Sequence, residues 1–225
     1  MKNLNIAIIG LGYVGLPLAL EFSKYFNTLG FDVSKKRVKE LNLFYDVTNQ
    51  FKKNKIKNSK IKFTDDQLLL QKYNIFIICV PTPVSNKNLP DLHNLKSATK
   101  IVSKYVKKND IIIYESTVYP GTTEDVCVPI IEKKSNLKLN KGFFVGYSPE
   151  RINPGDKKHT ITKIKKVISA SNTNTLNKIN FIYSKIISAG VYKTKSIKIA
   201  EAAKVIENTQ RDINIAFMNE LSIIF

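Results

Sequence analysis

Short apolar runs alternate with amphipathic patterns along most of the chain. The runs are too short for core helices and have the length of strands that are buried on both faces of a parallel sheet. They predict strands at residues 4–9, 28–31, 61–63, 75–80, 110–115, 143–147, 166–170 and 191–194. The patterns between them predict helices at 16–22, 34–45, 64–70, 92–106, 122–131, 174–188 and 196–225, and a polar loop at 46–60. This alternation predicts an α/β fold built on one doubly wound parallel sheet.

Hydroxyl side chains stand at the start of several helical patterns. Such a side chain caps a helix because its oxygen accepts a hydrogen bond from a free backbone N–H of the first turn. We expect caps at Ser34, at Thr64 with Gln67 as a capping box, at Thr122 and Thr123, and at Ser196.

The last predicted helix, 196–225, runs to the final residue without a Gly, Pro or polar stop. Its apolar positions lie on more than one side: Ile199, Ala203, Ile206, Ile213, Phe217, Leu221 and Ile224. A helix of this kind needs another surface to cover it. We expect a homodimer through this helix, and we expect the chain to be the front part of a longer protein.

A glycine-rich loop with the sequence GLGYVG, residues 10–15, separates the first strand from the first helix. A strand, this G-x-G-x-x-G spacing, a helix, a second strand and a final acid, Asp32, form the Rossmann dinucleotide-binding pattern. Gly10 permits the tight turn, Gly12 lets a pyrophosphate approach the backbone, and Gly15 lets the helix pack close to the strand. The alternative is a glycine turn in an unrelated α/β fold.

The same pattern predicts which cofactor binds. The pyrophosphate would lie on free N–H groups at the helix N-terminus, beside Tyr13 and Val14. Asp32 would accept a hydrogen bond from a ribose 2′-hydroxyl and would repel a 2′-phosphate, so NAD is favoured over NADP. Arg37, one turn into the next predicted helix, is a further cofactor-binding candidate and could soften that preference.

The charge balance bears on the kind of partner. The formal net charge is +18, from 36 Lys and Arg against 18 Asp and Glu. Arginine occurs only at Arg37, Arg151 and Arg211, and the densest basic run, 52–62, has few aromatic residues for base stacking. We therefore expect a solvated basic surface that suits an acidic substrate such as a nucleotide, and no nucleic-acid partner.

Apolar content and cysteine usage bear on the compartment. With 43% hydrophobic residues the chain can build a sizeable core, yet no run approaches the roughly 18 apolar residues of a membrane span. The two cysteines, Cys79 and Cys127, form no disulfide framework. His93 and His159 have no paired ligand pattern. These features predict a cytoplasmic protein with no membrane partner and no metal site.

Longer motifs resemble one family, the UDP-glucose/GDP-mannose dehydrogenases, which oxidise nucleotide sugars at C6. They are GLGYVGLP (10–17), GFD (30–32), VPTP (80–83), ESTVYPG (115–121), SPERINPGD (148–156) and AEAAKVIEN (200–208). The SPERINPGD form resembles the branch that acts on UDP-N-acetylglucosamine or UDP-N-acetylgalactosamine for surface polysaccharide biosynthesis. The resemblance implies NAD-dependent oxidation of a UDP-sugar to the UDP-uronic acid.

The resemblance also implies roles for residues at matching positions. Val80, Pro81 and Thr82 would line the path of NAD. Thr117 would contact the cofactor and hydrogen-bond near the reacting carbon or its water, and Glu150 would help to activate that water.

Lys204 and Asn208 are implied to stabilise the developing oxyanion. Their spacing of i and i+4 places them on one face of the last predicted helix, and a cation beside an amide donor suits an oxyanion.

One part of the family pattern has no counterpart in this chain. The family uses a catalytic cysteine in a glycine-rich segment after the AEAAKVIEN helix, and neither Cys79 nor Cys127 matches it. The resemblance therefore implies an NAD-binding domain (1–195), the start of a truncated central helical and dimerisation domain (196–225), and no C-terminal UDP-sugar-binding domain. We expect this chain alone to lack complete turnover.

Two other functions remain open. A 6-phosphogluconate or hydroxyacid dehydrogenase also has an N-terminal Rossmann fold and a lysine on a following long helix, although ESTVYPG and SPERINPGD weigh against it. A non-catalytic module would keep the cofactor and the dimer surface without the chemistry.

Overall fold

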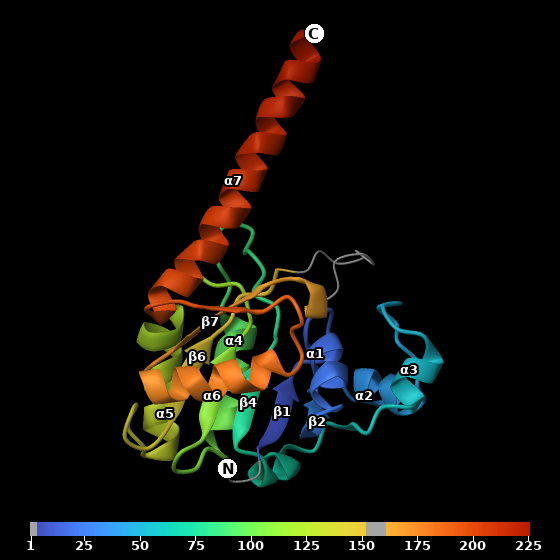
Figure 1. The fold of residues 1–225 in the computed structure, drawn as a ribbon, viewed down its shortest axis with the longest axis vertical. Coiled ribbons are helices and arrows are strands. Elements are labelled where there is room, and N and C mark those ends of the chain that lie inside the picture. The colour runs from blue at the N-terminus through green and yellow to red at the C-terminus, as the bar shows by residue number, and fades with distance from the viewer. Residues whose placement is uncertain (1–3, 152–160) are drawn as a thin grey trace.

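The computed structural model describes residues 4–151 and 161–225, which form an eight-stranded sheet with helices on both faces (Figure 1). The strands are β1 (Asn5–Ile9), β2 (Asn27–Phe31), β3 (Lys62–Thr64), β4 (Ile75–Ile78), β5 (Ile111–Tyr114), β6 (Phe144–Tyr147), β7 (Lys166–Ala170) and β8 (Val191–Lys193). The α-helices are α1 (Gly15–Phe22), α2 (Lys35–Asn42), α3 (Lys53–Lys57), α4 (His93–Ser103), α5 (Val128–Ser135), α6 (Thr173–Ser184) and α7 (Ile197–Ile224). Shorter helical segments of other types are η1 (Gln67–Lys72), η2 (Thr122–Cys127) and η3 (Ile161–Lys163). The predicted α/β class and the long final helix are confirmed.

The strand order is β3-β2-β1-β4-β5-β6-β7-β8. Neighbouring strands from β3 through β6 pair in parallel, so that Ile8 lies opposite Gly30 on one side and Ile77 on the other. β7 is antiparallel to β6, with Tyr147 opposite Ser169, and β8 is parallel to β7. The predicted doubly wound parallel sheet is thus confirmed except at the β6–β7 pair, which is antiparallel. An apolar run shows that a strand is buried but not which way it points.

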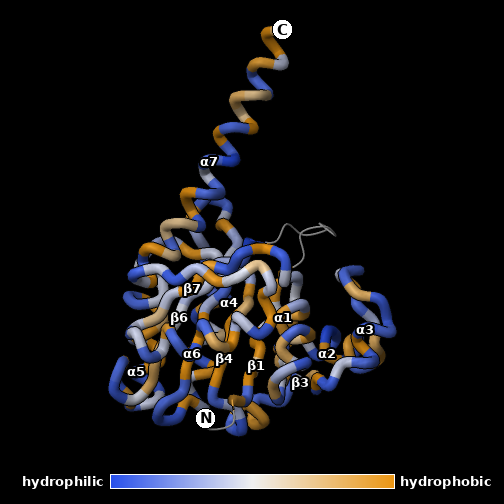
Figure 2. The backbone as a smooth tube through the Cα atoms, viewed as in Figure 1, coloured by the Kyte–Doolittle hydropathy of each residue, from blue (hydrophilic) through white to orange (hydrophobic). Residues whose placement is uncertain are grey.

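Alternate side chains of the central strands enter two separate apolar layers. Ile6 and Ile8 of β1 contribute to the layer covered by α1, α2 and α6. Ala7 and Ile9 contribute to the layer covered by α4, α5 and the start of α7. Figure 2 shows apolar residues concentrated along β1 and β4 at the centre of the sheet. Burial on both faces explains why these strands are continuous apolar runs in the sequence.

Of the four predicted helix caps, two are confirmed and two are wrong. Ser34 and Ser196 cap α2 and α7, as predicted, by accepting hydrogen bonds from first-turn N–H groups. The predicted capping box of Thr64 and Gln67 is wrong. Asp66 caps η1 instead, and the Thr64 hydroxyl accepts a hydrogen bond from the Asp66 N–H. Asp66 also accepts more strongly than a hydroxyl, because its oxygens are charged.

The start of η2 is held by a residue that is distant in the sequence. The predicted caps Thr122 and Thr123 are wrong, because the N-cap is Gly121 at φ +94° and the Thr122 hydroxyl donates to the Tyr119 carbonyl. The carboxylate of Glu201, in the first turn and a half of α7, accepts from the N–H groups of Gly121 at 2.6 Å and Thr123 at 2.9 Å. These two hydrogen bonds attach α7 to the segment after β5, and the Glu201 side chain that makes them is fully buried. We call this attachment the Glu201 clamp.

The polar segment predicted as a loop at 46–60 contains the short helix α3. One apolar residue, Ile56, is buried and anchors the segment. The lysines of the 52–62 run are exposed, as a solvated surface requires.

Helix α7 projects away from the sheet after its first turns (Figure 1). Its buried residues are Ile197, Ala200 and Glu201. Its large exposed apolar residues include Ile206, Ile213, Ile215, Phe217, Met218, Ile223 and Ile224. Among the described residues, no helix combines the length and the apolarity that a bilayer crossing demands.

Glu201→Gln is expected to lower the free energy of unfolding by about 1–3 kcal/mol, since the amide nitrogen cannot accept one of the two buried N–H groups. Chemical denaturation measures this. The control is Glu220→Gln on the exposed part of the same helix, which should change stability by no more than about 0.5 kcal/mol. Equal effects of the two substitutions would contradict the clamp.

Candidate functional site

The candidate site lies at one edge of the sheet, where the strand order reverses. β1 and β4 are neighbours, and from them the chain builds outward in opposite directions, which makes this pair the topological switch point. The glycine loop follows β1, and the 80–83 segment follows β4. In open α/β sheets ligands bind beyond the carboxyl ends of the strands at such a point.

The three motif glycines are required for different reasons. Gly10 has φ +94°, and a Cβ there would lie 2.9 Å from the Cys79 carbonyl oxygen. A Cβ on Gly15 would lie 1.8 Å from the Gly10 carbonyl oxygen. A Cβ on Gly12 would meet no atom of the described chain within 4 Å. Protein packing therefore accounts for Gly10 and Gly15, whereas the space beside Gly12 is open on the side that a ligand would approach.

The N-terminus of α1 faces the same space. Its N-cap is Val14, and no side chain caps it. The first N–H groups of a helix without a side-chain cap are donors with a partial positive charge, which suits an anion such as a diphosphate. Tyr13 is half exposed beside them.

Asp32 and Arg37 both hold the Leu11 peptide of the glycine loop. Asp32 Oδ2 accepts from the Leu11 N–H at 2.8 Å, and Asp32 Oδ1 accepts from the Ser34 N–H at 2.9 Å. Arg37 Nε donates to the Leu11 carbonyl at 2.9 Å, and its Nη2 pairs with Asp46 at 2.9 Å. Arg37 is buried, so it supports the loop from within, while its predicted cofactor contact stays a prediction.

The segments after β4 and β5 are bonded to each other. The Thr82 hydroxyl donates to the Thr117 carbonyl at 2.6 Å, and the Ser116 hydroxyl donates to the Val80 carbonyl at 2.6 Å. Pro81 and the Thr117 side chain are exposed. The structure thus brings the glycine loop, residues 80–82 and Thr117 to one edge, as the sequence predicts.

A buried ionic group lies next along this edge; we call it the Lys166 cluster, and it consists of Glu115, Glu150, Lys166 and Tyr183. Lys166 Nζ donates to Glu115 Oε2 at 2.5 Å and to Glu150 Oε2 at 3.1 Å. The Tyr183 hydroxyl donates to Glu115 Oε1. Glu115 is 1% exposed, Lys166 3% and Glu150 8%, so the charges compensate one another with little help from water.

Burial changes the pKa values in this cluster. It raises the pKa of Glu115 from 4.5 to about 7, with the ion pair to Lys166 opposing the shift and the negative charge of Glu150 adding to it. For Lys166, burial by itself lowers the pKa, but Glu115 and Glu150 outweigh it and hold the pKa above its ordinary value. Lys166 is therefore a permanent cation between two carboxylates.

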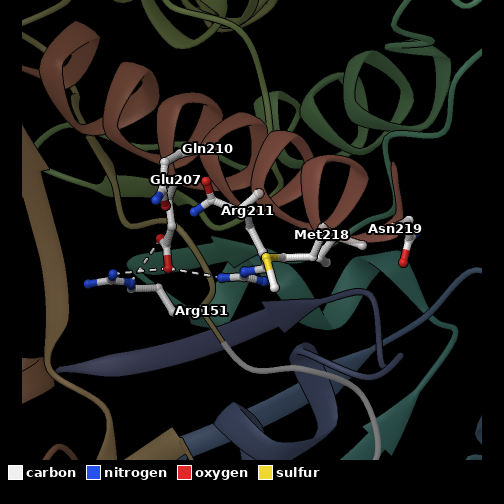
Figure 3. Close-up of a pocket in the computed structure, with 8 residues that line it drawn as sticks. Arg151, Glu207, Gln210, Arg211, Met218 and Asn219 are labelled. Atoms are coloured by element: carbon white, nitrogen blue, oxygen red, sulfur yellow. Dashed lines mark hydrogen bonds and ion pairs between the residues drawn. The ribbon is translucent and has the colours of Figure 1, made fainter. Parts of the chain in front are cut away.

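The start of α7 completes the edge. Lys204 is half-buried, and burial lowers its pKa from 10.5 against the opposing charges of Glu207 and Glu150. Asn208 is exposed one turn further on. Figure 3 shows Arg151 and Arg211 on either side of Glu207. Arg151 makes two contacts with the Glu207 carboxylate, at 3.0 and 3.1 Å, and these tie α7 to the segment after β6.

Both thiols of the chain are free and buried. Burial raises the pKa of Cys79, and it raises the pKa of Cys127 to about 11. A thiol of this kind is a poor nucleophile because the thiolate form is scarce. In the described part of the chain, no group of three His, Cys, Asp or Glu residues could hold a metal ion. His159 and residues 152–156 of the SPERINPGD motif lie outside the described residues.

Sequence reasoning missed three residues that organise this edge: Lys166, Glu201 and Glu207. Lys166 is the first residue of an apolar strand, and only the reversed direction of β7 brings it beside Glu150. Glu201 and Glu207 belong to the same helix as Lys204, but their partners lie far away in the sequence. A charged residue opening an apolar strand was the available signal for Lys166.

The switch point, the glycine loop and the acid after β2 define the class of this domain, a Rossmann-type dinucleotide-binding domain. The model of the UDP-glucose/GDP-mannose dehydrogenase family, NAD-binding domain, matches residues 4–187. The chain belongs to this family.

Comparison with individual proteins supports the same family. Protein CapL of Staphylococcus aureus is 54% identical over 223 residues, which are 99% of this chain and 53% of that protein. UDP-N-acetyl-D-glucosamine 6-dehydrogenase of Pseudomonas aeruginosa is 53% identical over 226 residues, 100% of this chain and 54% of that protein. The structure of UDP-N-acetyl-D-mannosamine dehydrogenase from Pyrococcus horikoshii superposes with a TM-score of 0.91 at 31% identity, covering 98% of this chain and 54% of that one. The chain spans about half the length of the curated relatives it matches.

Glu150→Gln is expected to lower the pKa of Glu115 from about 7, because a neighbouring negative charge disappears. Carbon-13 NMR titration of labelled glutamate carboxyls measures this, with Glu220→Gln as a control that leaves Glu115 unchanged.

The coupling between Glu115 and Glu150 also predicts how the stability of the fold depends on pH. Glu115 binds its proton more tightly in the folded protein than in the unfolded chain. Its contribution to the free energy of unfolding is therefore fully present below pH 4.5 and is lost as the pH rises toward about 7. The loss should be smaller in Glu150→Gln. An unchanged Glu115 titration in that variant would contradict the coupling.

Proposed function

We propose that this domain binds NAD, with the diphosphate at the N-terminus of α1 and the adenosine ribose at Asp32. Two observations support the fit. The space beside Gly12 is open, so a diphosphate can approach the backbone there, and a side chain at position 12 would block that approach. Asp32 uses one lone pair of each oxygen on backbone N–H groups, which leaves capacity to accept from a ribose hydroxyl. Val80, Pro81, Thr82 and Thr117 would line the nicotinamide side.

The proposed activity of the protein as a whole is oxidation of a UDP-N-acetylhexosamine at C6 to the UDP-uronic acid. Its main support is the 53% identity to UDP-N-acetyl-D-glucosamine 6-dehydrogenase across the whole chain. When bound, NAD supplies the hydride acceptor. The residues of this chain would orient the sugar and move protons around it.

The four proposed catalytic residues divide this work. Thr117, exposed at the end of the β5 segment, would hydrogen-bond to the reacting group or its water. Glu150 would orient and activate the water that releases the acid. Lys204 and Asn208 would stabilise negative charge on the sugar C6 oxygen, and partial burial strengthens the field of Lys204 there.

Three further proposals concern the domain boundary, the oligomeric state and the location of the protein. Ser196, the cap of α7, would mark the boundary between the NAD-binding domain (1–195) and a helical domain that starts at 196. A second copy of this chain would cover the exposed apolar residues of α7 in a homodimer, which sedimentation equilibrium can measure. The free buried thiols and the NAD chemistry support a cytoplasmic location.

Gly12→Ala is expected to weaken NAD binding at least about tenfold, since the added methyl group occupies the space where the diphosphate meets the backbone. The stability of the variant should be unchanged, because the new Cβ meets no protein atom within 4 Å. Titration calorimetry measures the affinity, and thermal unfolding without NAD is the control. Unaltered NAD affinity in the variant, or no NAD binding by the wild type, would refute the proposed site.

A substrate panel tests the activity. Because this chain alone is expected to lack complete turnover, the panel uses the whole protein that contains this domain. In that protein, NADH formation is expected with UDP-N-acetylglucosamine or UDP-N-acetylgalactosamine and not with 6-phosphogluconate or small hydroxyacids. Lys204→Met should lower the rate roughly 100-fold or more, the usual effect of losing one oxyanion donor. The matched control is Lys198→Met, on the first turn of the same helix with an exposed side chain. Turnover of hydroxyacids alone would favour the other dehydrogenase class, and NAD binding without any turnover would favour a non-catalytic module.

A further inference from the structure

The Lys166 cluster has no role in the activity described so far, apart from Glu150. Three of its members lie at the ends of neighbouring strands: Glu115 follows β5, Glu150 follows β6, and Lys166 begins β7. The fourth, Tyr183, is on α6. β7 runs antiparallel to β6, so its first residue lies at the carboxyl ends of the parallel strands, where the site is built. The cluster therefore lies at the edge of the sheet where the site is built, in contact with Glu150.

Stability alone is a poor explanation for such a cluster. Removing a charge from water costs several kcal/mol, and replacing a buried ion group by well-packed apolar residues is often neutral or stabilising. The strands around Lys166 are apolar, and Ile113 and Ile168 are fully buried in the same layer. Stability therefore does not explain why charged residues occur at this place. Their contact with Glu150 of the proposed site offers a functional explanation.

The hydrogen bonds of Lys166 identify that reason. Its ammonium group has three donors, and it meets three acceptors: Glu115, Glu150 and, at 3.3 Å, the Pro149 carbonyl. All its donors are engaged inside the protein, so Lys166 holds other groups and does not itself deliver a proton to a substrate. Glu115 is held in turn by the Tyr183 hydroxyl.

Glu150 is fixed from two sides by this arrangement. Its Oε2 accepts from Lys166 at 3.1 Å, and its Oε1 accepts from the Arg151 N–H at 2.6 Å. The first contact sets the direction of the carboxylate, and the second sets its rotation about the end of the side chain. A carboxylate that activates a water needs such a fixed direction, because small misplacements of a catalytic group are costly.

We propose that Lys166 is the positioning residue for Glu150, and that Glu115, braced by Tyr183, holds Lys166 in place for this purpose. The inference rests on the role proposed above for Glu150. It assigns a function to Glu115, the buried acid of the ESTVYPG motif, and to Lys166, a lysine outside every motif.

The test uses the double variant Lys166→Met with Glu115→Gln. It removes one positive and one negative charge together, so the formal charge of the cluster is unchanged, and the amide oxygen of the introduced glutamine can still accept from Tyr183. The matched control is Lys138→Met with Glu132→Gln, which removes an exposed ion pair of 3.0 Å on the surface. Both variants are first checked for folding by unfolding and for NAD affinity by calorimetry.

In UDP-sugar oxidation by the whole protein that contains this domain, the cluster variant is expected to lose about 100-fold in kcat, with KM for NAD and for the sugar little changed, since the binding groups stay in place. The surface variant should keep the wild-type kcat. A cluster variant that folds, binds NAD and keeps kcat overturns the proposal.

NMR of the wild type tests the same contact without turnover or a variant. The Lys166 ammonium is expected to give a separate, slowly exchanging nitrogen-15 signal with a through-space contact to the Glu150 side chain. Its absence overturns the proposal even if the cluster variant fails to fold. If the wild type binds no NAD, the proposed function fails. The NMR contact still shows in that case whether Lys166 holds the Glu150 side chain.

Discussion

The direction of the strands governs where every part of the site lies. β1, β2, β4, β5 and β6 all point the same way, so the residues that follow them meet at one edge although they are far apart in the sequence. β7 points the other way and brings its first residue, instead of its last, to that edge. The cation Lys166 therefore lies beside Glu115 and Glu150, which follow the carboxyl ends of β5 and β6. One reversal in the sheet therefore decides the electrostatics next to Glu150.

Carboxylates that accept backbone N–H groups are the recurring brace of this structure. Asp32 holds the glycine loop, Asp46 holds the segment after α2, Asp110 holds the turn before β5, and Glu201 holds the start of η2. Charged acceptors make short, strong hydrogen bonds with N–H donors. Asp46, Asp110 and Glu201 are buried in this role, whereas most of the more numerous lysines are exposed. This division contributes to a strongly basic exterior.

Helix α7 connects the fold to the proposed chemistry. Its first turns are buried and clamped by Glu201, and the Arg151–Glu207 pair attaches the next turn to the segment after β6. Lys204 lies between these two attachments, so its position relative to Glu150 is set from both sides. Beyond them the helix has no buried residue in the structure. The attached part of α7 carries Lys204 of the proposed site, and the projecting part leaves large apolar side chains exposed.

The sequence by itself determined the α/β class, the strands, most helices, the dinucleotide-binding loop and the family, because buried strands, glycine turns and serine caps such as Ser34 and Ser196 are local patterns. It also identified the residues that follow parallel strands, since that edge is shared by rule. Tertiary structure alone decided the direction of β7, the cap that Glu201 supplies to η2, the inward engagement of Arg37, and the Lys166 cluster. Each of these depends on a partner far along the chain, and local periodicity carries no information about which distant group will satisfy a buried charge or a free N–H.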